Sequence, residues 1–319
     1  MKPKVAFYWC AACGGCEEAV VDLGESILDV VAAVDIVLWP VALDFKKADI
    51  EAAPDGSIAA VFINGAVRTS EQEEMAHMLR RKSQIVIAFG SCAQTGGIPG
   101  LANLSNRKQI FSTVYGEAPS LESGATTVPL NEHKDNGHTV TLPVFWDTVR
   151  SLDQVIEVDY YIPGCPPTAK LLAQAVNALL SGELPPKGTT IGPDYALCTD
   201  CPRKDSKPDK LAIRQFHRPS EIEIDTEKCL LAQGLLCLGP ATRAGCESRC
   251  INGNMPCTGC FGPTSRVRDY GAKALSGIAS LADSNDEAEI SAILAGIPDP
   301  VGTFYRYSLP SSFLQRRKL

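Results

Sequence analysis

The chain has 319 residues, of which 45% are hydrophobic and 21% are charged, with a formal net charge of −7. This length provides core enough for one large domain or two medium ones. The acidic balance argues against nucleic acid as a partner, because phosphate binding needs a basic face. Simple solubility explains the same charge equally well.

The sequence offers no obvious membrane-spanning or export segment. Its longest apolar stretch, residues 30–43, is interrupted by Asp35 and Pro40 and is shorter than the roughly 20 residues of a spanning helix. The apolar run before Cys10, residues 5–9, has only five residues, and no twin-arginine pair occurs there, whereas a secretory signal needs an apolar run of about 7–15 residues. We therefore expect no membrane span and a cytoplasmic location.

Apolar runs and amphipathic segments alternate through the first 180 residues. The apolar runs predict strands at 5–9, 35–43, 58–63, 84–89 and 155–162. Helices are predicted at 17–34 and at 69–82, the second with Ser70 as its cap. Pro166-Pro167 open another helix, which ends before Gly182. This alternation is typical of an α/β fold with a flavodoxin-like, doubly wound parallel sheet.

The rest of the chain is less regular. Residues 115–143 are polar and too long for an ordinary connection, so they form a functional loop or an excursion over a partner. Eight cysteines fall within 198–260, a segment too poor in periodic apolar residues to fold without metal. We predict a flavodoxin-like domain at 1–183, an irregular cysteine-rich iron–sulfur domain at 184–265, and a helical extension with a tail at 266–319.

Thirteen cysteines are present in all. Disulfides are rare in the cytoplasm, and an odd number cannot pair completely. Metal binding is the better explanation, because twelve cysteines make three sets of four. The remaining one, Cys10, is either an alternative ligand to Cys13 or a buried free thiol.

The first set is scattered in sequence, yet its members occupy equivalent places. Cys13 and Cys16 follow the first predicted strand, Cys92 follows a central one, and Cys165 follows the last. In an open parallel sheet, ligands bind outside the carboxyl ends of the strands. The alternative is that Cys92 and Cys165 are buried structural thiols. Glycines that permit tight turns and close approach to an anionic cluster stand beside these cysteines: Gly14, Gly15, Gly90 and Gly164.

Two further sets lie in the cysteine-rich segment. They are Cys198, Cys201, Cys229 and Cys237, and then Cys246, Cys250, Cys257 and Cys260. Spacing alone does not separate a four-cysteine iron–sulfur cluster from a four-cysteine zinc site.

The residues around the cysteines resemble a known family. The runs CGGCEE, GSCAQTGGIPG around Cys92 and PGCPP around Cys165 resemble the proximal-cluster motifs of [NiFe]-hydrogenase small subunits. CLLAQGLLCLGP, followed by Cys246 and the PCTGC pair, is similar to the C-terminal domain of that family. The resemblance runs in order from Val5 to Cys260.

The resemblance implies three 4Fe-4S clusters. Cys13, Cys16, Cys92 and Cys165 would hold the proximal cluster, Cys246, Cys250, Cys257 and Cys260 the medial one, and Cys198, Cys201, Cys229 and Cys237 the distal one. It also implies that the Ni-Fe centre lies in a separate large subunit, so no catalytic residue is expected here. The chain would carry electrons from H2 oxidation to an iron–sulfur or flavin subunit.

Several positions depart from the usual family pattern. Cys198 stands where many periplasmic or membrane-linked relatives have histidine, and the medial site has four cysteines rather than three. Imidazole in place of thiolate raises potentials, so full thiolate ligation favours low ones. Gly14 stands where the family has a threonine. Glu18 matches a family glutamate, although a solvated carboxylate at the start of a helix explains it equally well.

These features resemble most the cytoplasmic methyl-viologen-reducing hydrogenases, which pass electrons to heterodisulfide reductase in methanogens and some bacteria. Two alternatives stay open. One is a relative of the cluster-bearing subunit of respiratory complex I, which has adjacent cysteines in its first motif and no eight-cysteine domain. The other is a zinc-stabilised scaffold without a redox role.

The C-terminal tail is rich in aromatic and basic residues. It contains Phe304, Tyr305, Tyr307 and Phe313 and ends in Arg316-Arg317-Lys318. Aromatic residues and arginine are enriched at interface hot spots. We expect the tail to dock on another subunit, anchored by Tyr305 and Tyr307; the alternative is that it packs on its own chain.

Overall fold

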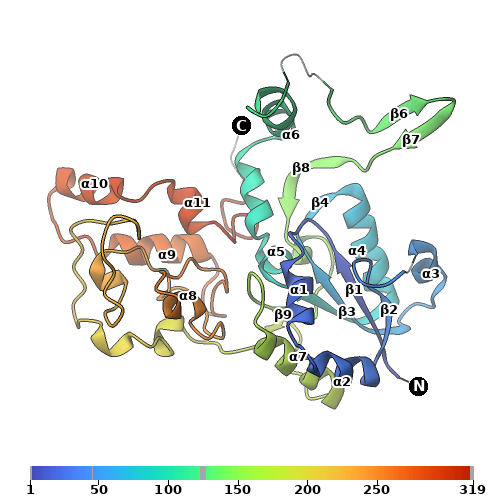
Figure 1. Cartoon of the computed structure of the whole chain (residues 1–319), viewed down its shortest axis with the longest axis horizontal. Helices are drawn as coiled ribbons and strands as arrows, with labels where there is room; N and C mark the ends of the chain where they lie inside the picture. The colour runs from blue at the N-terminus through green and yellow to red at the C-terminus, as the bar shows by residue number, and fades with distance from the viewer. Residues whose placement is uncertain (1, 45, 123–126, 317–319) are drawn as a thin grey trace.

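A six-stranded parallel sheet organises the N-terminal half of the computed structural model, which describes residues 2–44, 46–122 and 127–316 (Figure 1). Its spatial order is β10-β9-β5-β3-β1-β2. The five strands from β2 to β9 have the flavodoxin order 2-1-3-4-5, so the predicted fold class is confirmed. The strands are β1 (Lys4–Trp9), β2 (Asp35–Leu38), β3 (Ile58–Asn64), β5 (Ser83–Phe89), β9 (Tyr160–Ile162) and β10 (Thr189–Thr190).

Both faces of this sheet are covered by helices. Along β3, Val61 and Ile63 pack on one face, while Ala60 and Phe62 pack on the other. Helices α3 (Lys47–Ala52) and α4 (Ser70–Lys82) cover the first face, and α1 (Gly15–Val21), α2 (Ser26–Ala33) and α7 (Ala169–Ser181) cover the second. Burial on both faces explains why the strands are continuous apolar runs rather than alternating ones.

The predicted helix at 17–34 is two helices. The chain turns between α1 and α2, where Gly24 has φ +59°, a left-handed conformation that glycine adopts readily. The predicted strand at 155–162 keeps only its last three residues. A 3-10 turn at Leu152–Gln154 precedes it and brings Leu152 into the core.

Two helix starts also differ from the sequence prediction. Thr69, not Ser70, caps α4, because its Oγ1 accepts from the Gln72 N–H at 3.3 Å. Helix α7 begins at Ala169, two residues after the proline pair, and Thr168 caps it. Gly182 ends α7 in the left-handed conformation, as expected.

A long arm leaves the sheet domain between β5 and β9. The chain passes through α5 (Ser91–Thr95) and α6 (Arg107–Ser112) and extends into the hairpin of β6 (Glu132–Asp135) and β7 (His138–Thr141), which projects from the body in Figure 1. All eight hairpin strand residues are exposed. The arm returns as β8 (Phe145–Arg150), antiparallel to β4 (Val67–Thr69). Whether this excursion covers a partner stays a prediction.

The cysteine-rich segment shares one apolar core with the helices that follow it. Leu197, Leu235 and Cys257 belong to the same buried cluster as Tyr270 and Phe304. The four helices of this region are α8 (Arg249–Asn252), α9 (Tyr270–Ala279), α10 (Glu287–Ala295) and α11 (Pro300–Phe304). Turns complete the chain: 3-10 turns at 98–104, 197–199, 204–206 and 231–233, and a π-helical turn at Thr113–Glu117.

The prediction that Tyr305 and Tyr307 anchor the tail to another subunit is wrong. Tyr305 is only 7% exposed and belongs to the core of its own chain. The Tyr307 carbonyl accepts from the Gly97 N–H at 3.0 Å and from the Thr95 hydroxyl at 2.6 Å. Phe313 is 79% exposed, and Arg317 and Lys318 lie outside the described residues. The tail therefore closes back on the sheet domain, because aromatic rings gain more by burial in the core beside them.

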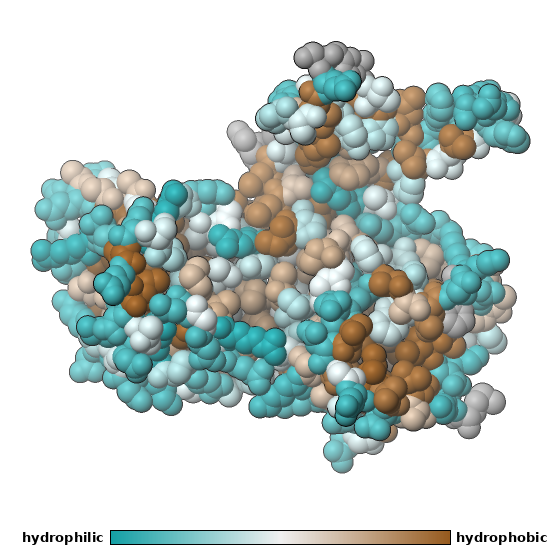
Figure 2. Space-filling view, in the orientation of Figure 1, coloured by the Kyte–Doolittle hydropathy of each residue, from teal (hydrophilic) through white to brown (hydrophobic). Residues whose placement is uncertain are grey.

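One corner of the surface is apolar. None of the residues of α2 is buried, and Leu28 is 69% exposed; Figure 2 shows apolar surface where α2 lies. A cavity of about 270 Å³ separates this helix from the sheet and from α7. In the described part of the chain, no helix is both long and apolar enough to cross a membrane.

Candidate metal centres

The first cysteine set converges at the carboxyl edge of the sheet. Cys13 follows β1, Cys16 lies on α1, Cys92 lies on α5 directly after β5, and Cys165 follows β9. Burial raises the pKa of Cys16 above its usual range, and the nearby Cys92, Cys165 and Cys13 thiols raise it further. Burial likewise raises the pKa of Cys92 to about 12, with Cys165 and Cys13 adding to it. These thiols are therefore near enough to influence one another, and their role as one ligand set stays a prediction.

Glycines pack directly against these sulfurs. Gly90 has φ +83°, and a Cβ atom there would lie 2.3 Å from Cys16 Sγ. At Gly97, with φ +55°, a Cβ atom would lie 2.5 Å from Cys92 Sγ. The Gly15 N–H donates to Cys13 Sγ at 3.5 Å. Sequence reasoning identified Gly90 and Gly15 but missed Gly97, whose role depends on the turn after α5.

The second set lines a single small cavity in the C-terminal region. Cys198, Cys201, Cys229 and Cys237 all contribute to its wall. Burial raises the pKa of Cys198 to about 12, followed by the effects of Cys237 and Cys201. Two of these cysteines come from Cys198-x-x-Cys201 and two from a separate loop, so the cavity joins segments that are about 30 residues apart.

A buried cation lies beside this second set. Arg203 lines the same cavity and is 7% exposed. Its guanidinium donates to the carbonyls of Asp225, Lys228 and Ile251 and to Asn254 Oδ1, at 2.8–3.3 Å. It forms no salt bridge with any carboxylate in the described residues. Because an uncompensated buried charge is costly, an anionic group held by these cysteines suits the site.

The third set lies between the other two. Burial raises the pKa of Cys260 to about 12, with contributions from Cys246, Cys165 and Cys250. Burial also raises the pKa of Cys257, whose thiol neighbours are Cys237 and Cys260. Cys246, Cys250 and Cys260 therefore lie together, and Cys257 lies at the side that faces the second set.

Neighbouring sets touch through their own cysteines. The Cys257 N–H donates to Cys237 Sγ at 3.4 Å, and the Leu238 N–H donates to the Cys257 carbonyl at 2.9 Å. On the other side, the hydroxyl of Ser91, the residue before Cys92, donates to the Cys260 carbonyl. The spatial order is therefore first set, third set, second set.

The spacing of the sulfurs bears on the kind of metal group. Within the described residues, no three His, Cys, Asp or Glu side chains come close enough to ligate one metal ion. A tetrahedral zinc site needs Zn–S distances of about 2.3 Å, which forces its sulfurs into tight contact. The described side chains therefore form no ready-made site for a single ion.

Cys10 lies apart from all three sets. It packs with Ile63 and Val67 on the opposite face of the sheet. Burial alone raises its pKa to about 12, without a contribution from another cysteine. A buried free thiol is therefore the interpretation of Cys10 that the structure supports.

Two adjacent glutamates have different environments. Glu18 is exposed, which fits the solvated carboxylate considered from sequence. Glu17 is only 3% exposed. Burial raises its pKa, while the nearby polar groups of Asn64 and Trp39 lower it. Sequence reasoning missed Glu17, although its position directly after Cys16 on the inward face of α1 was a usable signal.

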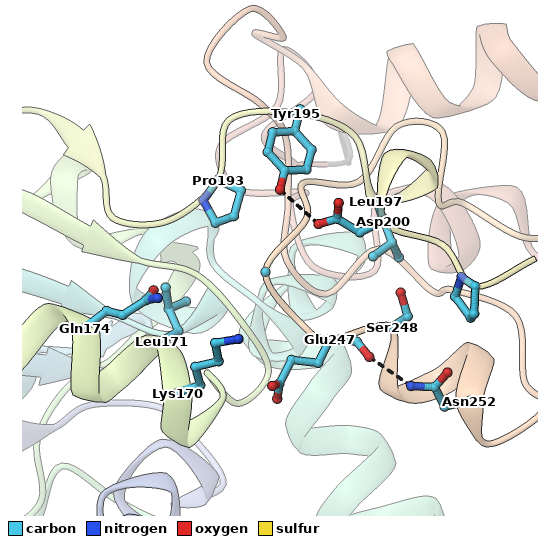
Figure 3. Close-up of a pocket in the computed structure, with 12 residues that line it drawn as sticks. Lys170, Leu171, Gln174, Pro193, Tyr195, Leu197, Asp200, Glu247, Ser248 and Asn252 are labelled. Atoms are coloured by element: carbon cyan, nitrogen blue, oxygen red, sulfur yellow. Dashed lines mark hydrogen bonds between the residues drawn. The ribbon is translucent and has the colours of Figure 1, made fainter. Parts of the chain in front are cut away.

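A pocket of about 380 Å³ separates α7 from the cysteine-rich segment (Figure 3). Lys170 on α7 faces Asp200 and Glu247 across it. The Tyr195 hydroxyl donates to Asp200 at 3.0 Å, and Asn252 donates to the Glu247 carbonyl at 3.0 Å. No sequence pattern indicates this pocket, because its walls come from segments that meet only in the folded chain.

Comparison with known proteins agrees with this arrangement. The family model described as NADH ubiquinone oxidoreductase, 20 Kd subunit, matches residues 13–179, which include the strands from β2 to β9 and the first cysteine set. The chain is also similar in fold to a [NiFeSe] hydrogenase from Desulfovibrio vulgaris Hildenborough, with a TM-score of 0.52 and 18% identity, over 89% of this chain and 98% of that one.

Relatives that match the whole chain distinguish between the [NiFe]-hydrogenase small subunits and the cluster-bearing subunits of complex I. An iron–sulfur subunit of the F420-non-reducing hydrogenase of Archaeoglobus profundus is 40% identical over 99% of both chains. A subunit of the vhu F420-non-reducing hydrogenase of Methanocaldococcus jannaschii is 36% identical over 98% of this chain and 97% of its own. The present chain therefore belongs to the [NiFe]-hydrogenase small-subunit family and is an iron–sulfur subunit of a hydrogenase, an oxidoreductase acting on hydrogen.

Proposed function

We propose that this chain is the electron-transfer subunit of a [NiFe] hydrogenase and holds three 4Fe-4S clusters. The proximal cluster would be held by Cys13, Cys16, Cys92 and Cys165. The medial cluster would be held by Cys246, Cys250, Cys257 and Cys260, and the distal cluster by Cys198, Cys201, Cys229 and Cys237. The assignment to this family and the spatial grouping of these cysteines support the proposal.

The contact between neighbouring sets is the observation that carries it. The Cys257 N–H meets a sulfur of the distal set at 3.4 Å, and the hydroxyl of Ser91, next to the proximal Cys92, donates to the carbonyl of the medial Cys260. When bound, 4Fe-4S clusters supply one-electron redox chemistry at potentials tuned by burial and by hydrogen bonds to sulfur. A continuous chain of ligand residues is what an electron-transfer subunit requires and what a zinc-stabilised scaffold does not.

The protein itself contributes ligation, exclusion of water and compensation of charge. Cys16, Cys92, Cys237 and Cys257 are buried, which keeps water from their sulfurs. Arg203 supplies a buried positive charge beside the distal set. The Gly15 N–H stabilises negative charge on Cys13 Sγ. These features lower the cost of burying an anionic cluster.

The partner at the proximal end would be the large subunit that carries the Ni-Fe centre. Cys13 is exposed, and Trp9 and Ile98 beside the proximal set are 40% and 45% exposed. An exposed ligand flanked by large apolar side chains suits a surface that another subunit covers. At the distal end, the acceptor would be an iron–sulfur or flavin subunit, such as the iron–sulfur subunit of heterodisulfide reductase, and the complex would be cytoplasmic.

Native purification of the complex without oxygen tests the proposal. We expect about twelve iron atoms and twelve acid-labile sulfides per chain, since three four-iron clusters are proposed. We also expect a large subunit to co-purify and to protect residues 9–16 from hydrogen exchange. Stoichiometric zinc with little iron would overturn the proposal, and so would iron for fewer than three clusters in fully loaded protein.

A further inference from the structure

Two buried hydroxyl groups lie between the medial and distal cysteine sets. Thr242 is 1% exposed and Tyr270, the first residue of α9, is 3% exposed. Their oxygens are 2.9 Å apart. Neither side chain is a proposed ligand, and neither was singled out from the sequence.

Thr242 reaches a proposed medial ligand directly. Its Oγ1 lies 3.5 Å from Cys257 Sγ. The same oxygen lies 2.7 Å from the Leu238 carbonyl, one helical turn earlier in the chain. The thiols of Cys257, Cys260 and Cys237 are near enough to the Tyr270 hydroxyl to raise its pKa, after the larger effect of burial.

The number of protons restricts how these groups can bond. Thr242 has one hydroxyl proton, and Tyr270 has one. With the Cys257 sulfur bound to metal, that sulfur accepts and does not donate. If Tyr270 donates to Thr242 Oγ1, the Thr242 proton is left for either the Leu238 carbonyl or Cys257 Sγ. Added negative charge on the sulfur draws that proton toward the sulfur, because bonds to charged acceptors are stronger.

Close packing holds the Tyr270 hydroxyl against the loop that carries Cys257 and Cys260. A Cβ atom at Gly259, which has φ +96°, would lie 2.2 Å from the Tyr270 hydroxyl oxygen. Gly259 is the residue before the ligand Cys260, so the ring lies directly against the medial ligand loop. Only glycine allows the hydroxyl to approach that loop so closely.

We propose that Thr242 donates a hydrogen bond to the Cys257 sulfur and thereby raises the reduction potential of the medial cluster, with Tyr270 as the positioning residue that orients the Thr242 hydroxyl. The inference rests on the proposed function, since it takes Cys257 as a medial ligand. Hydrogen bonds to ligand sulfurs stabilise the reduced, more negative state of a cluster. The medial cluster would therefore accept an electron more readily than its four thiolates alone would allow.

The test is a redox titration of the native complex, followed by EPR, in matched variants. Thr242→Val keeps the shape but removes the hydroxyl, and Thr242→Ser restores the hydroxyl. We expect Thr242→Val to lower the reduction equilibrium constant of the medial cluster about tenfold, which is about 59 mV for one electron. Thr242→Ser should stay near wild type. Tyr270→Phe should give a smaller shift in the same direction, because it acts through Thr242.

Thr258→Val is the control within the same loop. The Thr258 hydroxyl pairs with the Tyr307 hydroxyl at 3.2 Å and has no sulfur partner among the described residues, so the medial potential should not change. A second measurement follows exchangeable protons near the medial cluster by pulsed EPR in D2O. One coupled proton should disappear in Thr242→Val and return in Thr242→Ser.

The outcomes separate this inference from the proposed function. Iron content is measured for every variant, and wild-type protein without a medial cluster would defeat the proposed function itself. If three clusters assemble but Thr242→Val leaves the medial potential unchanged, the Thr242 proton belongs to the Leu238 carbonyl and the inference fails. If Thr242→Val and Thr242→Ser shift the potential equally, the hydroxyl is not the cause, because serine keeps it, and the inference fails as well.

Discussion

The proximal and the distal sites place four cysteines together by different means. Around the proximal set, parallel strands and their helices form a core that is mostly aliphatic and aromatic, with Cys16 as the one ligand of this set among its buried residues. Around the distal and medial sets, the cysteines are part of the core, since Cys237 and Cys257 are buried among its apolar side chains. The proposed proximal site lies at the edge of the sheet domain, whereas the cysteines of the other two sites form part of the interior of the C-terminal region.

The backbone reflects the same difference. Between β10 and α9 the described chain has only three 3-10 turns and the four-residue helix α8. Its hydrogen bonds are mostly short-range turns, such as the Gly234 N–H to the Leu231 carbonyl at 3.1 Å. A region of this kind depends on ligand bonds to define its shape. Metal loss should therefore affect the two halves of the chain unequally.

Removal of iron gives the largest expected effect. Chelation under reducing, oxygen-free conditions should unfold residues 198–260 and loosen the helices packed on them, while the sheet domain stays folded. Hydrogen exchange by mass spectrometry would report this, with protection lost in the C-terminal region and kept in β3 and β5. Equal protection in both halves after complete iron removal would contradict this difference between them.

A change at Gly90 should act on the proximal site alone. Gly90→Ala places a methyl group 2.3 Å from Cys16 Sγ on a backbone with φ +83°, so we expect loss of the proximal cluster and about eight iron atoms per chain. Gly56→Ala is the matched control, because Gly56 also has a positive φ, +70°, but nothing lies within 4 Å of the added methyl. If both variants keep all their iron, the space beside Cys16 is not needed for a cluster.

Sequence alone predicted the sheet and the convergence of the first set, because both follow from local patterns. Apolar runs define the strands, and cysteines directly after parallel strands must meet at one edge. It did not predict the break at Gly24 or the buried position of Glu17. Those depend on how α1 and α2 pack on the sheet, which is tertiary information that no short pattern contains.

The tail was predicted wrongly for a similar reason. Its aromatic composition indicated burial, and burial is what Tyr305 shows. Composition does not indicate whether these rings are buried by their own chain or by another subunit. Likewise, the contacts of Arg203 and Thr242 with the cysteine loops come from segments 15–50 residues apart, and nothing in their neighbouring residues marks them.

Replacement of one distal ligand gives the smallest expected effect. Cys198→His should leave three clusters in place and raise the distal potential by about 100 mV, since imidazole replaces a thiolate. Redox-titrated EPR on the native complex measures it. Cys10→Ala serves as the control, because the Cys10 thiol lies apart from every set, and all three potentials should stay unchanged. An unchanged set of potentials in Cys198→His would mean that Cys198 is not a ligand.

The closure of the tail on the sheet domain affects when the proximal site can be finished during synthesis. The turn after Cys92 donates two hydrogen bonds to the Tyr307 carbonyl, and Pro310 packs against Gly96 and Gly100. Those contacts join residues more than 200 positions apart, so a ribosome must release nearly the whole chain before the turn is complete. The strands can pair early, but a nascent chain still lacks the contacts of Tyr307 and Pro310 with this turn. If this site holds a cluster as proposed, we expect its insertion to follow synthesis of the tail, and truncated chains should expose Cys92 to thiol reagents.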